Sequence, residues 1–350
     1  MKIITRFLGR RFFWNFMLVL AVVCSIIYMI SFMQDIATEP TFMDALEKSF
    51  SKFLELFTMF LPPTIFLGTL ITFYKLTVSS EIIILQASGM SYFKIMRPMI
   101  LVTLLVGIIT TTIINPLIAK YNSIDLRDSQ IERIDNAVWI REKTTNGDLT
   151  IRSNNMEYKK SGDLVFIKGT AILQNANHQM IKRIDADKII LTDSKFIAKN
   201  ARILNFQGIE RFLDWEFPTT ISAKNIIRQY LKPNQTSFWE LPTLIKVLEK
   251  SGAQSQAHLI TFFTLLFLPL VLMSQTILGV MFSQTKDRRK FSFVKKFGFG
   301  IMTCFIVYFT IQTFNAIGSS GAISPILAVF LPPAIVTFFA NAIISRHSNM

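Results

Sequence analysis

Charged residues are scarce in this chain, and the sequence motifs of several enzyme classes are absent. Only 17% of its 350 residues are Asp, Glu, Lys or Arg, whereas a soluble domain carries about a quarter. No glycine is followed by lysine, which excludes a P-loop and ATP hydrolysis by that route. There is no H-E-x-x-H or C-x-x-C motif, and the three histidines lie far apart. The sequence therefore predicts neither a metal site nor a catalytic residue.

Hydrophobic residues, in contrast, make up 51% of the chain and gather in six long windows, two of which contain the two cysteines, Cys24 and Cys304. Each window can cross roughly 30 Å of hydrocarbon as a helix, which takes about 20 residues. The windows are Phe12–Met33, Phe53–Phe73, Met99–Ala119, Leu259–Phe282, Phe297–Ile317 and Ile326–Ile344. We therefore expect an α-helical polytopic membrane protein with six transmembrane helices and one inserted domain.

The expected domain boundaries follow from these windows. Residues 1–119 would hold transmembrane helices one to three, with a coupling helix near 79–90. Residues 120–255 would form the inserted domain with its flanking helices, and residues 256–350 would hold helices four to six.

Lys and Arg are unevenly divided between the two sets of short loops. One set, together with the N-terminus, is rich in bases, whereas the other holds only Lys48 and Lys52 beside several acids. Short cytoplasmic loops are enriched in Lys and Arg, so both termini are predicted to be cytoplasmic and the insert periplasmic. The pI of 9.8 reflects these juxtamembrane bases, and nucleic-acid binding is not predicted.

The insert changes to short alternating segments from Ala137 to Ile221, separated by turn signals such as Asn146-Gly147-Asp148. This pattern predicts an all-β, jelly-roll-like domain. The alternation fails around Ile184 and Ile189, which predicts a bulge or turn near Asp185. Such a domain either pairs an edge strand with a partner or merely caps the membrane part.

Helical segments are expected on both sides of this β domain. The segment 123–134 is predicted to extend the third span as a helix, and an amphipathic helix is predicted to end at Gly252.

The stretch "SSEIIILQASGMS", residues 79–91, contains a lone acid, Glu81, in the short link between the second and third spans. Ser79-Ser80 is a candidate N-cap and Gly89 a candidate end, which predicts a short amphipathic helix. Two interpretations are open at this point. The helix either inserts its aliphatic residues, Ile83, Ile84 and Leu85, into a groove of a partner, or it rests on lipid with Glu81 as its cap.

The spans are rich in phenylalanine and almost free of charge. The stripe of Phe57, Phe60 and Phe66 suits a cavity for acyl chains, although phenylalanine also faces lipid in any membrane protein. Glu55 is the exception among the charges, and the lack of an ionisable chain argues against ion-coupled transport.

Nearly the whole chain resembles the lipopolysaccharide export permease family, LptF and LptG. The resemblance is carried by "FMQDI", "FLPPTIFLGTL", "SEIIILQASGMS", "LEKSGAQSQAHLITFFTLLFLPL" and the C-terminal "FGFGIMTCFIVYFTIQTFNAIGSSGAISPILAVFLPPAI". The third segment is the most specific, because family members carry an acid, an aliphatic run and a Gln/Arg-Ala-Ser-Gly sequence at this link. The C-terminal segment is closer to LptG than to LptF.

This resemblance implies a permease subunit of an ATP-binding-cassette transporter in the bacterial inner membrane, which extracts lipopolysaccharide and passes it to a periplasmic bridge. The implied partners are a second LptF/LptG-type permease as heterodimer, a cytoplasmic LptB-type ATPase dimer and an LptC-type periplasmic jelly-roll protein. ATP and Mg²⁺ would be bound by the ATPase, so no cofactor is expected in this chain. The implied ATPase-coupling residues are Glu81, Ile84, Leu85, Gln86, Ala87, Ser88 and Gly89.

The expected lipid-binding residues are Phe32, Lys48, Lys52, Phe57, Phe60, Phe66, Tyr308 and Gln312. LptG members often carry lysines at the outer ends of spans one and two, where this chain has Asp35, Glu39 and Glu55. Lys48 and Lys52 could substitute for them, the lipid head group could differ, or the partner permease could supply the positive charge.

Two other functions remain open from the sequence. One is a non-transporting membrane scaffold, and the other is a mechanotransmitting permease whose periplasmic domain binds a partner.

Overall fold

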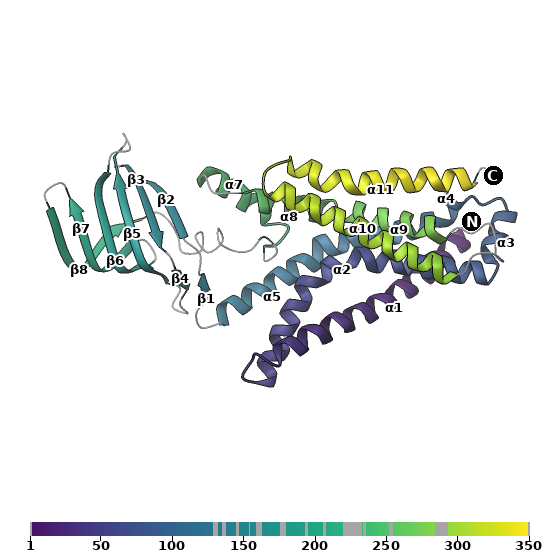
Figure 1. Ribbon diagram of the computed structural model, residues 1–350, viewed down its shortest axis with the longest axis horizontal. Helices are drawn as coiled ribbons and strands as arrows, with labels where there is room; N and C mark the ends of the chain where they lie inside the picture. Colours follow the sequence, from purple (N-terminus) through teal and green to yellow (C-terminus); the bar gives the residue numbers. More distant parts are fainter. Residues whose placement is uncertain are drawn as a thin grey trace. The chain divides into compact units, whose positions relative to one another are not determined.

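The structure is a computed structural model, in which the chain forms two compact units (Figure 1). The residues that it describes are 2–128, 132–134, 138–144, 147–153, 155–158, 163–175, 180–192, 195–205, 208–219, 233, 236–251, 255–283 and 293–348. The helical unit comprises Met1–Ala119, Thr236–Pro242 and Ser255–Met350, and the β unit comprises Lys120–Gln235 and Thr243–Gln254.

Long apolar helices make up most of the helical unit. Within the described residues, five helices are long and apolar enough to cross a membrane, and a bent pair provides a sixth span. The helices in chain order are α1 (Lys2–Asp35), α2 (Phe42–Val78), α3 (Glu81–Ala87), α4 (Tyr92–Ile109), the π-helical η1 (Thr110–Ile114), α5 (Asn115–Asp128), α7 (Leu241–Ser251), α8 (Gln256–Leu266), α9 (Leu268–Ser283), α10 (Phe293–Ser319) and α11 (Pro325–Ser348).

Helix α2 begins at Phe42, well before the apolar window that predicted it. Thr41 caps it, since its hydroxyl accepts a hydrogen bond from the Asp44 N–H at 3.2 Å. The helix continues through Pro62 and Pro63. Figure 1 shows α2 changing direction along its length, as expected for a helix with prolines inside it.

The third and fourth spans are both irregular. The third is interrupted by η1, and the fourth is bent by 55° between α8 and α9. The predicted helical extension of the third span holds as far as Asp128, at the end of α5. It is wrong for Glu132–Ile134, which form strand β1 because they pair with β4. The amphipathic helix predicted before Gly252 is confirmed as α7.

The β unit contains one antiparallel sheet. Among the described residues its strands are β1 (Glu132–Ile134), β2 (Val138–Thr144), β3 (Gly147–Ser153), β4 (Asn155–Tyr158), β5 (Leu164–Gln174), β6 (Met180–Thr192), β7 (Lys195–Asn205) and β8 (Gly208–Pro218). They are ordered β1-β4-β5-β6-β7-β8. The first half of β5 pairs with β4 and its second half with β3, which in turn pairs with β2.

The pairing of β6 with both neighbouring strands is interrupted close to the place where the alternation fails. In β6 the buried residues are Ile184 and Ala186, and then Ile189 and Leu191, so the inward phase shifts by one residue. The ladder from β6 to β5 and to β7 is interrupted there. The register is the same on both sides of the gap, so the irregularity predicted near Asp185 is present but is not a bulge. Lys168 and Asn200, in the two neighbouring strands, have a left-handed conformation there, with φ 53° at each.

The inward face of the sheet forms its own apolar core. Phe166, Phe196 and Phe217 lie at its centre, with ring centroids 6.4 Å apart for the first pair and 5.1 Å for the second. The apolar cluster of the sheet is thus separate from those of the helical unit.

Candidate functional site

The short helix α3 lies at the same end of the helical unit as both chain termini (Figure 1). It begins after Ser80, which has a left-handed conformation with φ 61°. The helix ends before Ser88 and Gly89, and Gly89 has φ 82°, a value that favours glycine. The predicted helix is therefore present with the predicted end. The predicted cap is not confirmed, because Ser80 is the N-cap residue and makes no side-chain capping hydrogen bond. The Ser79 hydroxyl instead donates to Glu81 Oε1 at 2.7 Å.

Two faces of α3 have opposite surroundings. Ile82 is buried and Leu85 packs against the same core, so these residues attach α3 to the helical unit. Ile83 and Ile84 point away from it and are 53% and 66% exposed. Following them, Gln86, Ala87, Ser88 and Gly89 are also exposed. The surface available to a partner thus consists of Ile83, Ile84 and the Gln-Ala-Ser-Gly segment, whereas Leu85 faces inward.

Glu81 is held by an arginine of the first span. Arg11 Nη1 donates to Glu81 Oε1 at 2.6 Å and to Oε2 at 2.5 Å. Burial alone would raise the pKa of the Glu81 carboxyl, but the hydrogen bonds from Arg11 and Ser79 and the charge of Arg11 outweigh it. The pKa of Glu81 therefore lies below its ordinary value, and the carboxylate is ionised at neutral pH.

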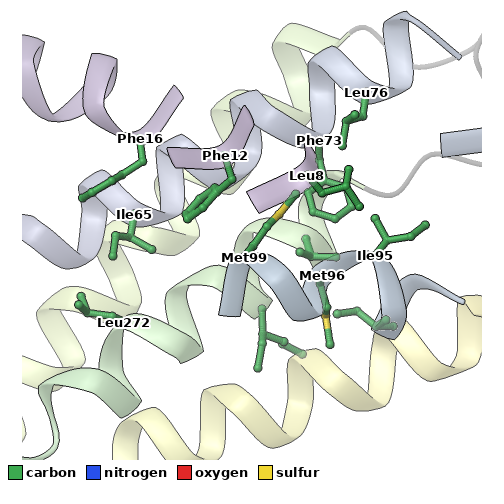
Figure 2. Close-up of a cluster of buried hydrophobic side chains, with 14 of the residues drawn as sticks. Leu8, Phe12, Phe16, Ile65, Phe73, Leu76, Ile95, Met96, Met99 and Leu272 are labelled. Carbon is green, nitrogen blue, oxygen red and sulfur yellow. The ribbon is translucent and has the colours of Figure 1, made fainter. Parts of the chain in front are cut away.

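Beneath this ion pair, α1, α2 and α4 share one apolar cluster. Figure 2 shows Leu8 and Phe12 of α1 gathered with Phe73 of α2 and with Met96 and Met99 of α4. All of these side chains are at most 4% exposed. Helices α1, α2, α3 and α4 therefore pack around a common apolar cluster at this end of the bundle.

Lys48 and Lys52, the two lysines predicted to bind lipid, each form an ion pair with an acid of this chain. Lys52 donates to Asp35, which is only 1% exposed and also accepts from Ser49. Lys48 donates to Glu39. Both lysines lie within α2. Each lysine charge is thus neutralised by an acid of the same chain, which weakens its attraction for a lipid phosphate.

The candidate aromatic residues have several different surroundings. Phe32 contacts Tyr28 and Phe42 in a row of rings between α1 and α2, and Phe57 joins the same row through Phe53. Phe60 is 36% exposed.

The other candidates lie deeper or on another span. Phe66 is fully buried against Phe282 of α9. On α10, the Gln312 side chain donates to the Tyr308 hydroxyl at 3.1 Å. A shared lipid-binding role for all of these residues stays a prediction.

A family model described as the lipopolysaccharide export system permease LptF/LptG matches residues 6–346 of the chain. The chain belongs to the LptF/LptG family. The match spans nearly the whole sequence, and it confirms both the resemblance and the fold class, a polytopic helical membrane protein with an inserted β domain. It does not distinguish LptG from LptF. A comparison with curated proteins found no match.

Membership of the LptF/LptG family gives the chain a place in lipopolysaccharide export as a multi-pass permease of the inner membrane. The family is a permease component of the transporter and not a classical enzyme. Within the described residues, no group of His, Cys, Asp or Glu side chains could hold a metal ion.

Sequence reasoning misses one residue of the α3 site, Arg11. The sequence indicates Arg11 only as one of the bases that set topology, because a contact between residues 11 and 81 leaves no local pattern. The available signal is Glu81 itself. A single acid in a strongly basic set of loops is expected to have a basic partner.

Proposed function

We propose that this chain is one permease half of an ATP-driven transporter that extracts lipopolysaccharide from the inner membrane and passes it to a periplasmic bridge. The other half would be a second LptF/LptG-type permease. ATP and Mg²⁺ would be bound by a separate LptB-type ATPase dimer, since the sequence has no P-loop. The β unit would be periplasmic and would join an LptC-type jelly-roll protein.

The observation that carries this proposal is the exposed apolar surface of α3. Ile83 and Ile84 are large aliphatic residues on a seven-residue helix, and both are more than half exposed. The helix is attached behind by Ile82 and Leu85, so its outer surface is presented on a fixed support. A groove of an ATPase that closes over these side chains would bury apolar area and gain affinity.

The bundle also has apolar surface to offer to a second permease and to lipid. Helices α1 and α10 carry large side chains that are 60% exposed or more, including Leu18, Met29, Met33, Phe305 and Phe309. In a membrane such faces contact acyl chains or another helix without penalty. A lipid path between the first span of one permease and the fifth span of the other agrees with this distribution.

A pull-down with the tagged chain in mild detergent, followed by mass spectrometry, tests the partners. Wild type is expected to bring down a P-loop ATPase and a second six-span permease. Glu81→Lys is expected to lose the ATPase, because a lysine beside Arg11 is repelled by it and displaces α3. Glu55→Lys is the control, because it reverses an exposed acid on α2, outside α3, and is expected to keep every partner. Wild type isolated alone, or Glu81→Lys with its ATPase retained, would overturn the proposal.

The substrate requires a separate measurement. Photo-crosslinkers at Phe32, Phe60 and Tyr308 of the assembled complex are expected to capture lipopolysaccharide. If none of these positions forms a lipid adduct while the ATPase is bound and active, the chain is not a lipid permease.

A further inference from the structure

The ion pair between Arg11 and Glu81 joins two parts of the chain that the proposed function treats separately. Arg11 belongs to α1, and Glu81 is the first residue of α3. Their side chains are 28% and 30% exposed. The pair is thus partly shielded from water, which makes its electrostatic attraction stronger than that of a fully exposed pair.

The carboxylate of Glu81 is largely used within the chain. It accepts three hydrogen bonds, two from Arg11 Nη1 and one from Ser79. An ionised carboxylate has about four acceptor positions. Little of this group remains for an ATPase, whereas Ile83 and Ile84 beside it are open.

In the turn after Arg11, α1 is also held to α2 by hydrogen bonds and by close packing. Asn15 is buried, donates to Thr72 Oγ1 at 3.0 Å and accepts from Lys75 Nζ at 2.7 Å. One residue further, the backbone of Phe16 lies directly against Gly68, where a Cβ would come within 3.0 Å of the Phe16 Cα. Helix α1 therefore cannot shift against α2 at this end without breaking polar contacts.

We propose that Arg11 is the positioning residue of the docking helix, and that Glu81 acts through Arg11 and not by touching the ATPase. Arg11 holds α3 to the first span, so a displacement of α3 by the ATPase is passed directly to α1. The ATPase binds the exposed apolar residues Ile83 and Ile84. This inference rests on the proposed function, in which α3 is the ATPase dock and α1 borders the lipid path.

The test uses the assembled complex in lipid nanodiscs and three readouts: the amount of bound ATPase, its hydrolysis rate, and lipopolysaccharide released per ATP. The variants are Arg11→Gln, Glu81→Gln and the exchange Arg11→Glu with Glu81→Arg. Arg10→Gln is the matched control, because Arg10 is the exposed neighbour of Arg11 on α1. Each variant is first compared with wild type by thermal unfolding in detergent.

Arg11→Gln is expected to keep most of the bound ATPase and to lower lipid release per ATP about tenfold, a typical size for coupling between two sites. Glu81→Gln should give the same result, since it removes the same pair. The exchange variant restores the pair with reversed charges and should recover release. Arg10→Gln should behave as wild type.

Two results would overturn the inference. If Arg11→Gln matches Arg10→Gln in all three readouts, the ion pair transmits nothing. If the exchange variant folds but still fails, Glu81 contacts the ATPase directly. Failure of the proposed function is distinguishable, since the wild-type complex would then lack either the ATPase or lipid release. If Arg11→Gln is too unstable to assay, lipid release by the exchange variant decides: recovery supports the inference, and failure in a folded complex overturns it.

Discussion

Gly68 sets the distance between the first two spans. A Cβ at this position would lie 3.0 Å from the Phe16 Cα and 3.2 Å from its Cβ. Neither atom can rotate away, because one is backbone and the other is fixed to it. The absence of a side chain therefore brings the two helices close enough for Asn15 to reach both Thr72 and Lys75.

Gly68→Ala is expected to destabilise the helical unit by about 1–3 kcal/mol through overpacking. This loss of stability should appear as a lower melting temperature when the variant is unfolded thermally in detergent. Gly298→Ala is the control, because a Cβ at Gly298 meets nothing within 4 Å among the described residues. That variant should be unchanged or slightly more stable. Equal melting temperatures for the two variants would contradict the close contact.

The ionisation of Glu81 gives a second prediction at this scale. Its pKa is lower in the folded chain than in the unfolded one, so the pair contributes stability above the ordinary carboxyl pKa. This contribution is lost as pH falls through the folded pKa. Wild type should therefore exceed Glu81→Gln in stability by a constant amount between pH 6 and pH 8, and the difference should shrink only in more acidic buffer.

The same pH series in an Arg11→Gln background supplies the control. Without the arginine, the stability lost on making Glu81→Gln should be much smaller at every pH. A difference that already changes between pH 6 and pH 8 would show that another group is being titrated.

At the scale of elements, the irregularities of the third and fourth spans fit one another. The hydroxyl of Thr111, within η1, donates to the Leu265 carbonyl at 2.8 Å, next to the bend between α8 and α9. The bend frees carbonyl groups that have no helical partner. Gly107 of the third span also lies against Pro269 of the fourth, since a Cβ at Gly107 would be only 2.6 Å from the Pro269 Cα. The π-helical turn thus places a donor where the neighbouring span needs one.

Thr111→Val keeps the size of this side chain and removes its hydroxyl. It leaves the buried Leu265 carbonyl short of a donor, so we expect a loss of about 1–3 kcal/mol in the free energy of unfolding. Thr112→Val is the control, because the Thr112 hydroxyl donates to the Ile108 carbonyl within the same span, in an exposed hydrogen bond. Equal unfolding midpoints in a denaturant series would show that the inter-span bond contributes nothing.

Hydropathy and alternation predicted most elements, because both follow from burial of one face or of a whole helix. They could not predict the start of α2 at Phe42, which depends on the Thr41 cap. They also missed η1, which no hydropathy or alternation pattern marks and whose Thr111 hydroxyl bonds to the neighbouring span. Glu132–Ile134 were misassigned for the same reason, as only pairing with β4 makes them a strand.

The candidate site was predictable only in part. Glu81 stands out as a lone acid in a segment with a specific resemblance, and the helix around it is present. The inward orientation of Leu85 and the partner of Glu81 depend on tertiary packing. So do the internal partners of Lys48 and Lys52, which lie nine and seventeen residues away along the chain.

At the scale of the whole molecule, the chain has two units with separate apolar cores. The core of the β unit lies between Ile140 and Phe217, and the cores of the helical unit contain residues of that unit alone. Among the described residues, none of these clusters contains a side chain from the other unit. We therefore expect the β unit to fold and unfold on its own. A fragment of residues 120–254 should therefore show strand-type circular dichroism and a cooperative thermal transition.

Phe166→Ala tests this independence. Phe166 is fully buried and packs against Phe196, so its truncation should cost about 3–5 kcal/mol and lower the transition of the fragment. Phe212→Ala is the control, because Phe212 is 41% exposed on β8. In the full-length chain, Phe166→Ala should lower the same transition and leave the melting of the helical unit in place. A single shared transition that moves as a whole would mean that the two units unfold together.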